Sequence, residues 1–156
     1  MNLSDTVVVG IGNPYRRDDG IGPALADAVE ALGLPGVRTA TLPATTSDLL
    51  HTWAGASLAI VVDAVRCEPS SPGRIHRVHP GATGSTELSA TPASTHELSL
   101  EQAARLGELL GLEPARLVVF AVEAADLGHG EGFSPAVEAA LPALLRAVAE
   151  ELGQPA

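Results

Sequence analysis

Leu58-Ala59-Ile60-Val61-Val62-Asp63 is the stretch of this 156-residue chain that decides the fold. Its five apolar residues follow one another without alternation, which is typical of a strand buried on both faces of a parallel sheet. The run then ends abruptly in a carboxylate. We therefore predict a central strand that carries Asp63 at its carboxyl end.

Strand-like runs and helical patterns alternate on both sides of this segment. β-Branched and aliphatic runs predict further buried strands, and the imperfect alternation of residues 73–79 predicts an edge strand. Pro142 is expected either to bend the last helix or to split off its first turns. The predicted strands are 6–10, 37–42, 58–63, 73–79 and 117–122, the predicted helices are 20–33, 46–54, 99–110 and 135–148, and residues 80–95 are a predicted long loop.

This order predicts an α/β fold, a three-layer α/β/α sandwich with a mostly parallel five-stranded sheet and one antiparallel edge strand. Right-handed crossovers place helices on both faces of such a sheet. Hydrophobic residues make up 46% of the chain and aromatic residues only 3%, so aliphatic side chains must fill the core. No repeat or linker divides the sequence, and residues 1–156 are expected to form a single domain.

Charge and composition argue against several classes of function. The formal net charge is -10, and all nine basic residues are Arg, so no basic stripe is present to bind nucleic acid. The single cysteine, Cys67, excludes an internal disulfide and fits a reducing compartment. The first residues lack a signal-peptide pattern, and no apolar run approaches the ~20 residues of a membrane span. We therefore expect a cytoplasmic protein.

Three candidate metal ligands are predicted at the rim formed by the carboxyl ends of the strands. Asp19 follows the first strand, Asp63 ends the third, and His96 precedes the helix before the last strand. Ligands usually bind at this rim of a doubly wound sheet, near its topological switch point. Two carboxylates and one imidazole suit a divalent nickel, zinc or iron ion. Each residue also has a structural alternative, because Asp commonly caps turns and helix starts and a lone His can be solvated.

Other candidate sites have weaker support. The turn Gly10-Ile11-Gly12-Asn13 resembles a dinucleotide fingerprint, but Tyr15 stands where its third glycine belongs, and Asp18 and Asp19 would repel a pyrophosphate. Cys67 could add a soft ligand four residues after Asp63, although a single buried thiol is most simply inert core. The remaining histidines, His51, His76, His79 and His129, are most simply solvated.

Four segments resemble the hydrogenase maturation endopeptidases. Residues 9–22 match the family's opening signature, in which a strand and a G-x-G-N turn are followed by a D-[DE]-x-x-G step. Residues 60–65 match its strand with a terminal Asp, residues 94–98 its S-x-H-x-L segment, and residues 133–138 the start of its closing helix. The segments occur in the family's order and span nearly the whole chain.

This resemblance implies an endopeptidase that recognises nickel already installed in the large-subunit precursor of a nickel-iron hydrogenase. Such an enzyme removes the precursor's C-terminal extension, and the client supplies the nickel. Asp19, Asp63 and His96 match the family's metal ligands and catalytic site. One departure is Pro43, which occupies a position where the family often has an acidic residue. It motivates an alternative, a noncatalytic metal-binding or metallochaperone-like relative of the same fold.

Overall fold

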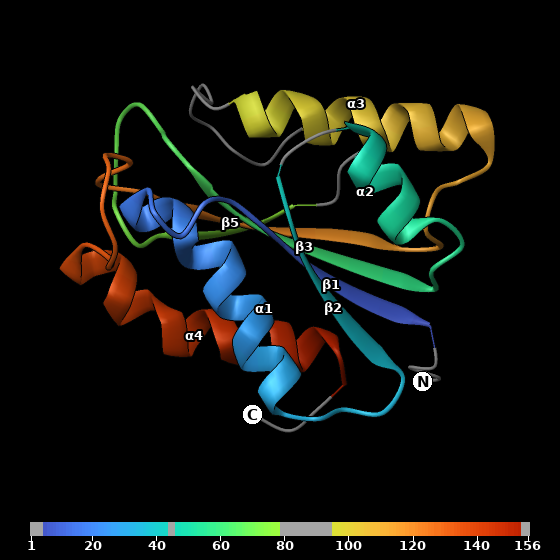
Figure 1. Cartoon of the computed structure of the whole chain (residues 1–156), viewed down its shortest axis with the longest axis horizontal. Coiled ribbons are helices and arrows are strands. Elements are labelled where there is room, and N and C mark those ends of the chain that lie inside the picture. Colours follow the sequence, from blue (N-terminus) through green and yellow to red (C-terminus); the bar gives the residue numbers. More distant parts are fainter. Residues whose placement is uncertain (1–4, 44–45, 79–94, 154–156) are drawn as a thin grey trace.

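The computed structural model describes residues 5–43, 46–78 and 95–153. Within these ranges strands and helices alternate along the chain (Figure 1). The strands are β1 (Thr6–Ile11), β2 (Val37–Leu42), β3 (Leu58–Val65), β4 (Ile75–Val78) and β5 (Leu117–Glu123). The helices are η1 (Arg17–Gly20, a 3-10 turn), α1 (Ile21–Ala31), α2 (Thr46–Trp53), α3 (Thr95–Leu110) and α4 (Pro135–Glu151).

The five strands form one sheet in the order β2-β1-β3-β5-β4. β1, β2, β3 and β5 are parallel, and β4 pairs antiparallel with β5 at one edge. The topological switch point lies between β1 and β3, because β2 is added on one side of β1 and the later strands are added on the other side. The predicted fold, its antiparallel edge strand and its switch point are therefore confirmed.

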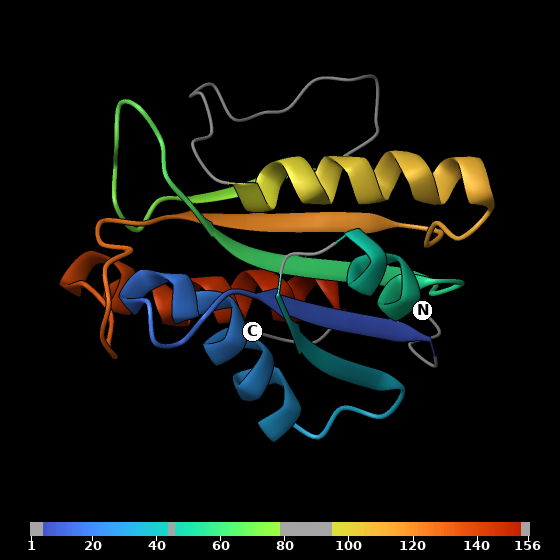
Figure 2. The same cartoon turned by 45° about the horizontal axis from the view of Figure 1, so that its top comes forward.

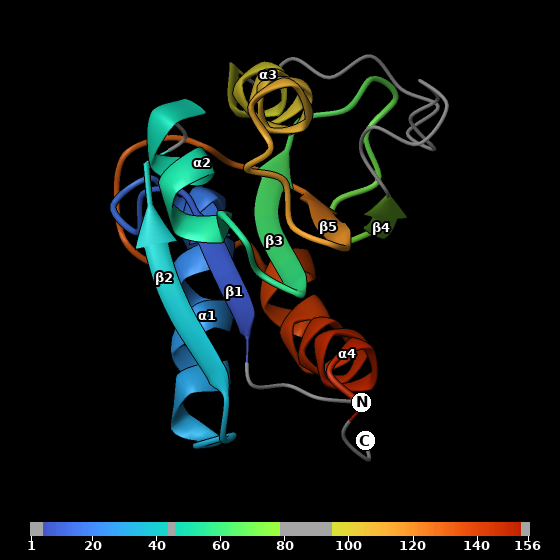
Figure 3. The same cartoon turned by 90° about the vertical axis from the view of Figure 1, so that its right-hand side faces the viewer.

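Helices cover both faces of the sheet (Figures 1 and 3). On one face, α1 and α4 pack against one set of alternate strand residues, which includes Val8, Ile60 and Phe120. On the other face, the other set, which includes Val9 and Val61, packs with α2 and α3. Successive side chains of a strand point to opposite faces of the sheet. Because helices bury both faces, the central strands are apolar at nearly every position.

Glycines allow α1 to begin directly against the strands. A Cβ on Gly10 would lie 2.2 Å from the backbone oxygen of Gly22, and a Cβ on Gly22 would lie 2.5 Å from Ile11 O and 2.6 Å from Val62 O. Gly12 has a φ of +143°, a conformation that favours glycine. The glycines of the first turn therefore serve close packing between the helix and the sheet, and their spacing needs no phosphate ligand to explain it.

Several boundaries differ from the sequence-based predictions. η1 precedes α1, and α3 begins at Thr95 rather than near Ser99. α4 continues through Pro142, so the predicted split is wrong. Its buried residues Val137, Leu144 and Val148 continue to pack against the sheet on either side of the proline, and this tertiary packing maintains the helix. The predicted loop lies mostly in residues 79–94, which are outside the described ranges, as is His79.

None of the helices in the described ranges combines the length and the hydrophobicity needed to cross a lipid bilayer.

Candidate active site

Asp19 lies in η1, immediately beyond the carboxyl end of β1. Its residue is only 3% exposed, and its Oδ2 accepts a hydrogen bond of 2.8 Å from the Asn13 amide. A Cβ on Gly12 would lie 1.9 Å from the backbone oxygen of Asp19, so only glycine lets the turn lie this close to Asp19. The G-x-G-N turn therefore fixes Asp19 at the rim in two ways, by a missing side chain and by a backbone donor.

Asp63 lies near the carboxyl end of β3 and is 2% exposed. Val62 pairs with Gly10 in the parallel register, which puts Asp63 beside the last residue of β1. Strand alternation directs Asp63 to the same face as Val61, the face covered by α2 and α3. Because η1 follows β1 and contacts β3, the segments that carry Asp19 and Asp63 are neighbours at the rim.

His96 belongs to the first turn of α3. That turn lies over the edge where β1 and β3 end, on the face to which Asp63 points (Figures 1 and 2). The side chain of His96 is outside the described part of the structure. The backbone thus brings the segments of all three predicted ligands to one edge of the sheet, and their joint action on a metal remains a prediction.

Asp18 is directed away from this group and joins two loops. It is fully buried. Its carboxylate accepts hydrogen bonds from the amides of Ala125, Asp126 and Ser134 and from the Ser134 hydroxyl, at 2.7 to 2.9 Å. Ser134 is the N-cap residue of α4 but makes no side-chain cap hydrogen bond, and its hydroxyl donates to Asp18. Of the two adjacent aspartates, Asp18 therefore has a structural role that accounts for its burial.

These bonds also set the pKa of Asp18. Burial alone would raise it, because a carboxylate loses hydration when it is removed from water. The hydrogen bonds from Ser134, Asp126 and Ala125 stabilise the charged form, and together they hold the pKa of Asp18 below its usual value. Asp18 is thus a carboxylate at neutral pH.

Backbone contacts reinforce the same connection between the loop after β1 and the loop after β5. The Arg17 amide donates to Gly130 O, and the Gly130 amide donates to Tyr15 O. The Arg16 guanidinium donates to Leu127 O at 3.0 Å. Arg17 also forms an ion pair with Asp126 at 3.4 Å. The loop that carries Asp19 is therefore held by many bonds to a second loop on the same rim.

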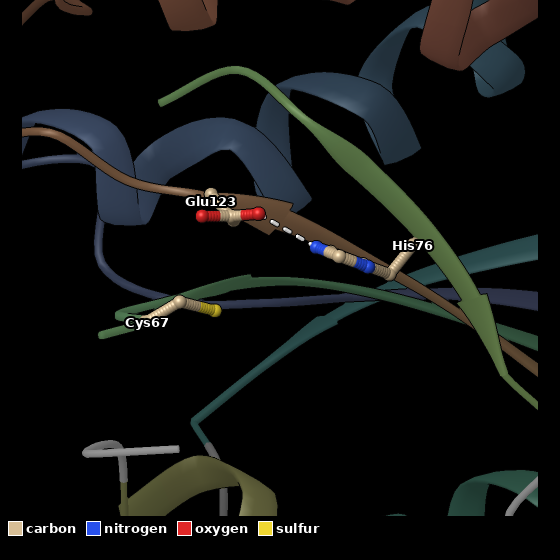
Figure 4. A group of neighbouring side chains, drawn as sticks. All are labelled: Cys67, His76 and Glu123. Carbon is tan, nitrogen blue, oxygen red and sulfur yellow. Dashed lines mark hydrogen bonds and ion pairs between the residues drawn. The ribbon is translucent and has the colours of Figure 1, made fainter. Parts of the chain in front are cut away.

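A second polar group, absent from the sequence-based site, lies on the α2 and α3 face. Cys67, His76 and Glu123 each offer a ligand atom, and these three atoms lie within 4.8 Å of one another (Figure 4). The prediction that His76 is solvated is wrong, since its side chain is only 12% exposed and its Nε2 lies 2.7 Å from Glu123 Oε2. His51 and His129 are exposed, as predicted.

Only the sheet register could have revealed this group. Cys67 follows β3, His76 lies on β4, and Glu123 ends β5. Glu123 is distant in sequence from the other two, and the antiparallel pairing of β4 with β5 brings it next to His76. The sequence held two separate signals, Cys67 four residues after Asp63 and Glu123 as a carboxylate that ends an apolar run, but neither indicated that the two residues meet.

Comparison with known proteins gives the family. Residues 44–151 match the family model of the hydrogenase maturation proteases. No curated protein sequence matches the chain significantly.

Solved structures show the same fold. The hydrogenase maturating endopeptidase HybD from E. coli superposes with a TM-score of 0.81 at 24% identity, covering 95% of this chain and 91% of that one. The NiFe hydrogenase maturation protease HybD from Thermococcus kodakarensis gives 0.74 at 20% identity, with coverages of 95% and 98%. A hydrogenase 2 maturation peptidase from a Thaumarchaeota archaeon gives 0.71 at 25% identity, with 97% and 99%. With the family model matching more than half of its length, this chain belongs to the hydrogenase maturation protease family.

Proposed function

We propose that this protein is an endopeptidase that recognises nickel in the large-subunit precursor of a nickel-iron hydrogenase and removes the precursor's C-terminal extension. In this proposal Asp19, Asp63 and His96 are both the metal ligands and the catalytic site. The nickel is part of the substrate and arrives with the client. The reaction takes place in the cytoplasm, before the large subunit joins its partner.

The observation that carries the proposal is the pair of buried carboxylates on neighbouring segments, Asp19 in η1 after β1 and Asp63 near the carboxyl end of β3. Asp19 and Asp63 are 3% and 2% exposed. Burying two carboxylates in neighbouring segments is costly unless a cation or hydrogen bonds offset their charge. A divalent ion carried by the client supplies such a charge when the complex forms. In the proposal His96, in the first turn of α3, supplies the nitrogen of a set of O, O and N donors, which suits nickel.

A three-ligand set leaves coordination positions for the client's own groups, as in other open metal sites. The protease and the client would then share one ion, so a client that lacks nickel forms a weaker complex. Selectivity follows from this difference in affinity. The arrangement makes cleavage conditional on metal loading, which is the order that maturation of a metal centre requires.

The experiment is cleavage of a purified nickel-loaded precursor, followed by the intact mass of the large subunit. We expect the wild-type protein to shorten the loaded precursor and to leave the nickel-free precursor uncut. Asp63→Asn preserves side-chain size but removes a ligating charge, and it should slow cleavage by at least about tenfold. Asp27→Asn makes the same change at an exposed position of α1 and should cleave normally.

Circular dichroism must show that Asp63→Asn is folded for the comparison to count. If the folded variant cut the precursor at the wild-type rate, the assignment of Asp63 would be wrong. Equal cleavage of precursors with and without nickel would refute metal recognition. Cell fractionation tests the cytoplasmic location.

The second candidate function is a noncatalytic metal-binding or metallochaperone-like relative of the same family. Pro43 favours it, because an exposed proline follows β2 at a position where the resemblance leads one to expect an acidic residue. The same mass measurement separates the two functions. A precursor that binds the protein but keeps its full mass would support the noncatalytic alternative.

A further inference from the structure

The cluster of Cys67, His76 and Glu123 lies beside the candidate active site but is built from other residues. Asp63 and His76 both pair with Ala121, one from each side. With strands spaced about 4.8 Å apart, the backbones of Asp63 and His76 are about 10 Å apart across the sheet. The cluster therefore extends from the end of Asp63's own strand, where Cys67 follows β3, across β5 to His76 on the antiparallel edge strand β4.

We propose that Cys67, His76 and Glu123 form a second metal site that binds zinc. A thiolate, an imidazole and a carboxylate are the three kinds of ligand that Zn²⁺ takes in proteins. The three ligand atoms already lie within 4.8 Å of one another. They come from the segment after β3, from β4 and from the end of β5 (Figure 4), so one bound ion would join three parts of the sheet.

The three ligand atoms, all within 4.8 Å of one another, lie at most about 1 Å beyond the spacing of a tetrahedral zinc site. Zinc bonds of about 2.0–2.3 Å in a tetrahedral arrangement separate ligand atoms by roughly 3.3–3.7 Å. The Glu123 carboxylate and the His76 ring are 2.7 Å apart, so the ion enters by replacing their hydrogen bond and separating them by about half an ångström. Rotation about side-chain bonds is sufficient for a change of this size.

Two of the three proposed ligands are buried, and one of them is a carboxylate. Cys67 and Glu123 are each 3% exposed. Burial raises the pKa of Glu123, but the hydrogen bonds from the Ser71 amide and His76, together with the charge of Arg74, outweigh it and lower the pKa below its usual value. Glu123 is therefore ionised and ready to bind a cation.

The surroundings also hold the carboxylate in place. Glu123 Oε1 accepts a hydrogen bond of 2.7 Å from the Ser71 amide, which leaves Oε2 directed at His76. The backbone of Glu123 is bonded on both sides, to Arg74 O through its amide and to the Gly73 amide through its carbonyl. Such partners of a ligand commonly fix its orientation in metal sites.

Cobalt provides the test, because Co²⁺ substitutes for Zn²⁺ and gives a near-ultraviolet charge-transfer band when a thiolate binds it. Cys67 is the only cysteine in the chain, so this band reports on one residue. We expect the full-length wild-type protein to develop the band with Co²⁺ and to lose it when Zn²⁺ is added. Zn²⁺ should also raise the thermal unfolding midpoint, as any ligand of the folded state does.

Variants separate this site from the proposed active site. Cys67→Ser should lose the band, and His76→Gln and Glu123→Gln should weaken Zn²⁺ binding by at least about tenfold. Asp63→Asn should keep the band. His51→Gln and Glu138→Gln make the same changes at exposed positions and should bind Zn²⁺ like the wild type. Because no client is used, the result does not depend on whether the protein is a nickel-reading protease.

Two results would overturn the proposal. One is the absence of a thiolate band in folded wild-type protein at millimolar Co²⁺, a measurement that needs no variant to fold. The other is a band that disappears in Asp63→Asn but persists in His76→Gln, which would assign the thiolate to the rim site instead.

Discussion

Asp18 and Asp19 are adjacent in sequence, yet their carboxylates bind different segments. Asp19 accepts from the Asn13 amide within its own loop, whereas Asp18 accepts four hydrogen bonds from residues more than 100 positions later. The 3-10 turn η1 makes this possible, because consecutive residues of a tight helix point in different directions.

We expect substitution of Asp18 to destabilise the protein, because its carboxylate accepts four hydrogen bonds from the loop after β5. Asp18→Asn keeps the size of the side chain but puts an NH₂ group among backbone donors, which leaves buried groups without partners. We expect the free energy of unfolding to fall by about 1–3 kcal/mol at pH 7. Urea denaturation measures it, with Asp27→Asn as the exposed control. A change below about 0.5 kcal/mol would contradict the structural role.

The same residue predicts a dependence on pH. The folded-state pKa of Asp18 is lowered, so its contribution to stability is fully present above the unfolded value of about 3.9 and is lost as the pH falls through the folded-state pKa. The difference in unfolding free energy between wild type and Asp18→Asn should therefore be constant from pH 7 to about 5 and shrink below about 4. A difference that grew on acidification would show that the sign is wrong.

For single residues, the sequence predicted where a carboxylate would lie better than it predicted which residues that carboxylate would contact. The position of Asp63 near a strand end could be predicted because a carboxylate that ends an apolar run is a local signal, and Asp19 could be placed in the loop after the first strand. The pairing of His76 with Glu123 could not, because it depends on which strand lies beside β5. The separate role of Asp18 depends equally on a loop that is distant in sequence.

Among the secondary-structure elements, α1 packs closely against the sheet at Gly22, in its first turn. A Cβ on Gly22 would lie 2.5 to 2.7 Å from backbone atoms of Ile11 and Val62. Backbone atoms in two strands cannot move aside as the end of a flexible side chain can.

Gly22→Ala should therefore destabilise the protein by about 1–3 kcal/mol, the usual cost of overpacking. Gly107→Ala is the matched control, because it is also a buried helical glycine, but its new Cβ would meet Leu50 Cδ2 at 3.3 Å. There the preference of helices for Ala, worth up to about 1 kcal/mol, should leave stability unchanged or raised. Thermal denaturation compares the two, and equal midpoints would refute this account of α1.

Predictions of elements succeeded where the pattern was periodic and failed where tertiary contacts decide. The five strands, the antiparallel edge strand and the contact between the first and third strands were predicted, because continuous apolar runs and alternating helices permit few topologies. A bend or a split at Pro142 was predicted from propensity alone, and α4 is not split because the residues on either side of the proline stay packed on the sheet.

For the whole molecule, the sheet divides the core into two faces. Ile60 belongs to the face covered by α1 and α4, and Leu49 to the face covered by α2 and α3. Ile60→Val should lower the unfolding free energy by about 0.5–1.5 kcal/mol and Leu49→Ala by about 2–5 kcal/mol. Because the two side chains share no cluster, the double variant should equal their sum within about 0.5 kcal/mol. Urea denaturation of the three variants checks this, and a larger discrepancy would mean that the faces are coupled through the strands.

The overall architecture was predictable because composition restricts how such a chain can bury itself, with aliphatic residues filling layers of helix and sheet. What the sequence could not supply was the arrangement of the rim, since loops carry few periodic signals. The family resemblance indicates which residues lie at the rim, and the sheet register shows which of their segments are neighbours. Residue patterns alone give neither.

The buried carboxylate of Asp18 gives the loop between β5 and α4 an unusual property. The amides of Ala125, Asp126 and Ser134 lie outside every helix and strand but donate to an ionised group that water does not reach. In deuterated buffer these amides should therefore exchange as slowly as those of a regular element, and only when a larger unit of the fold opens. The border of the candidate active site would then be as rigid as the sheet below it, so a hydrogenase precursor would meet a preformed edge there.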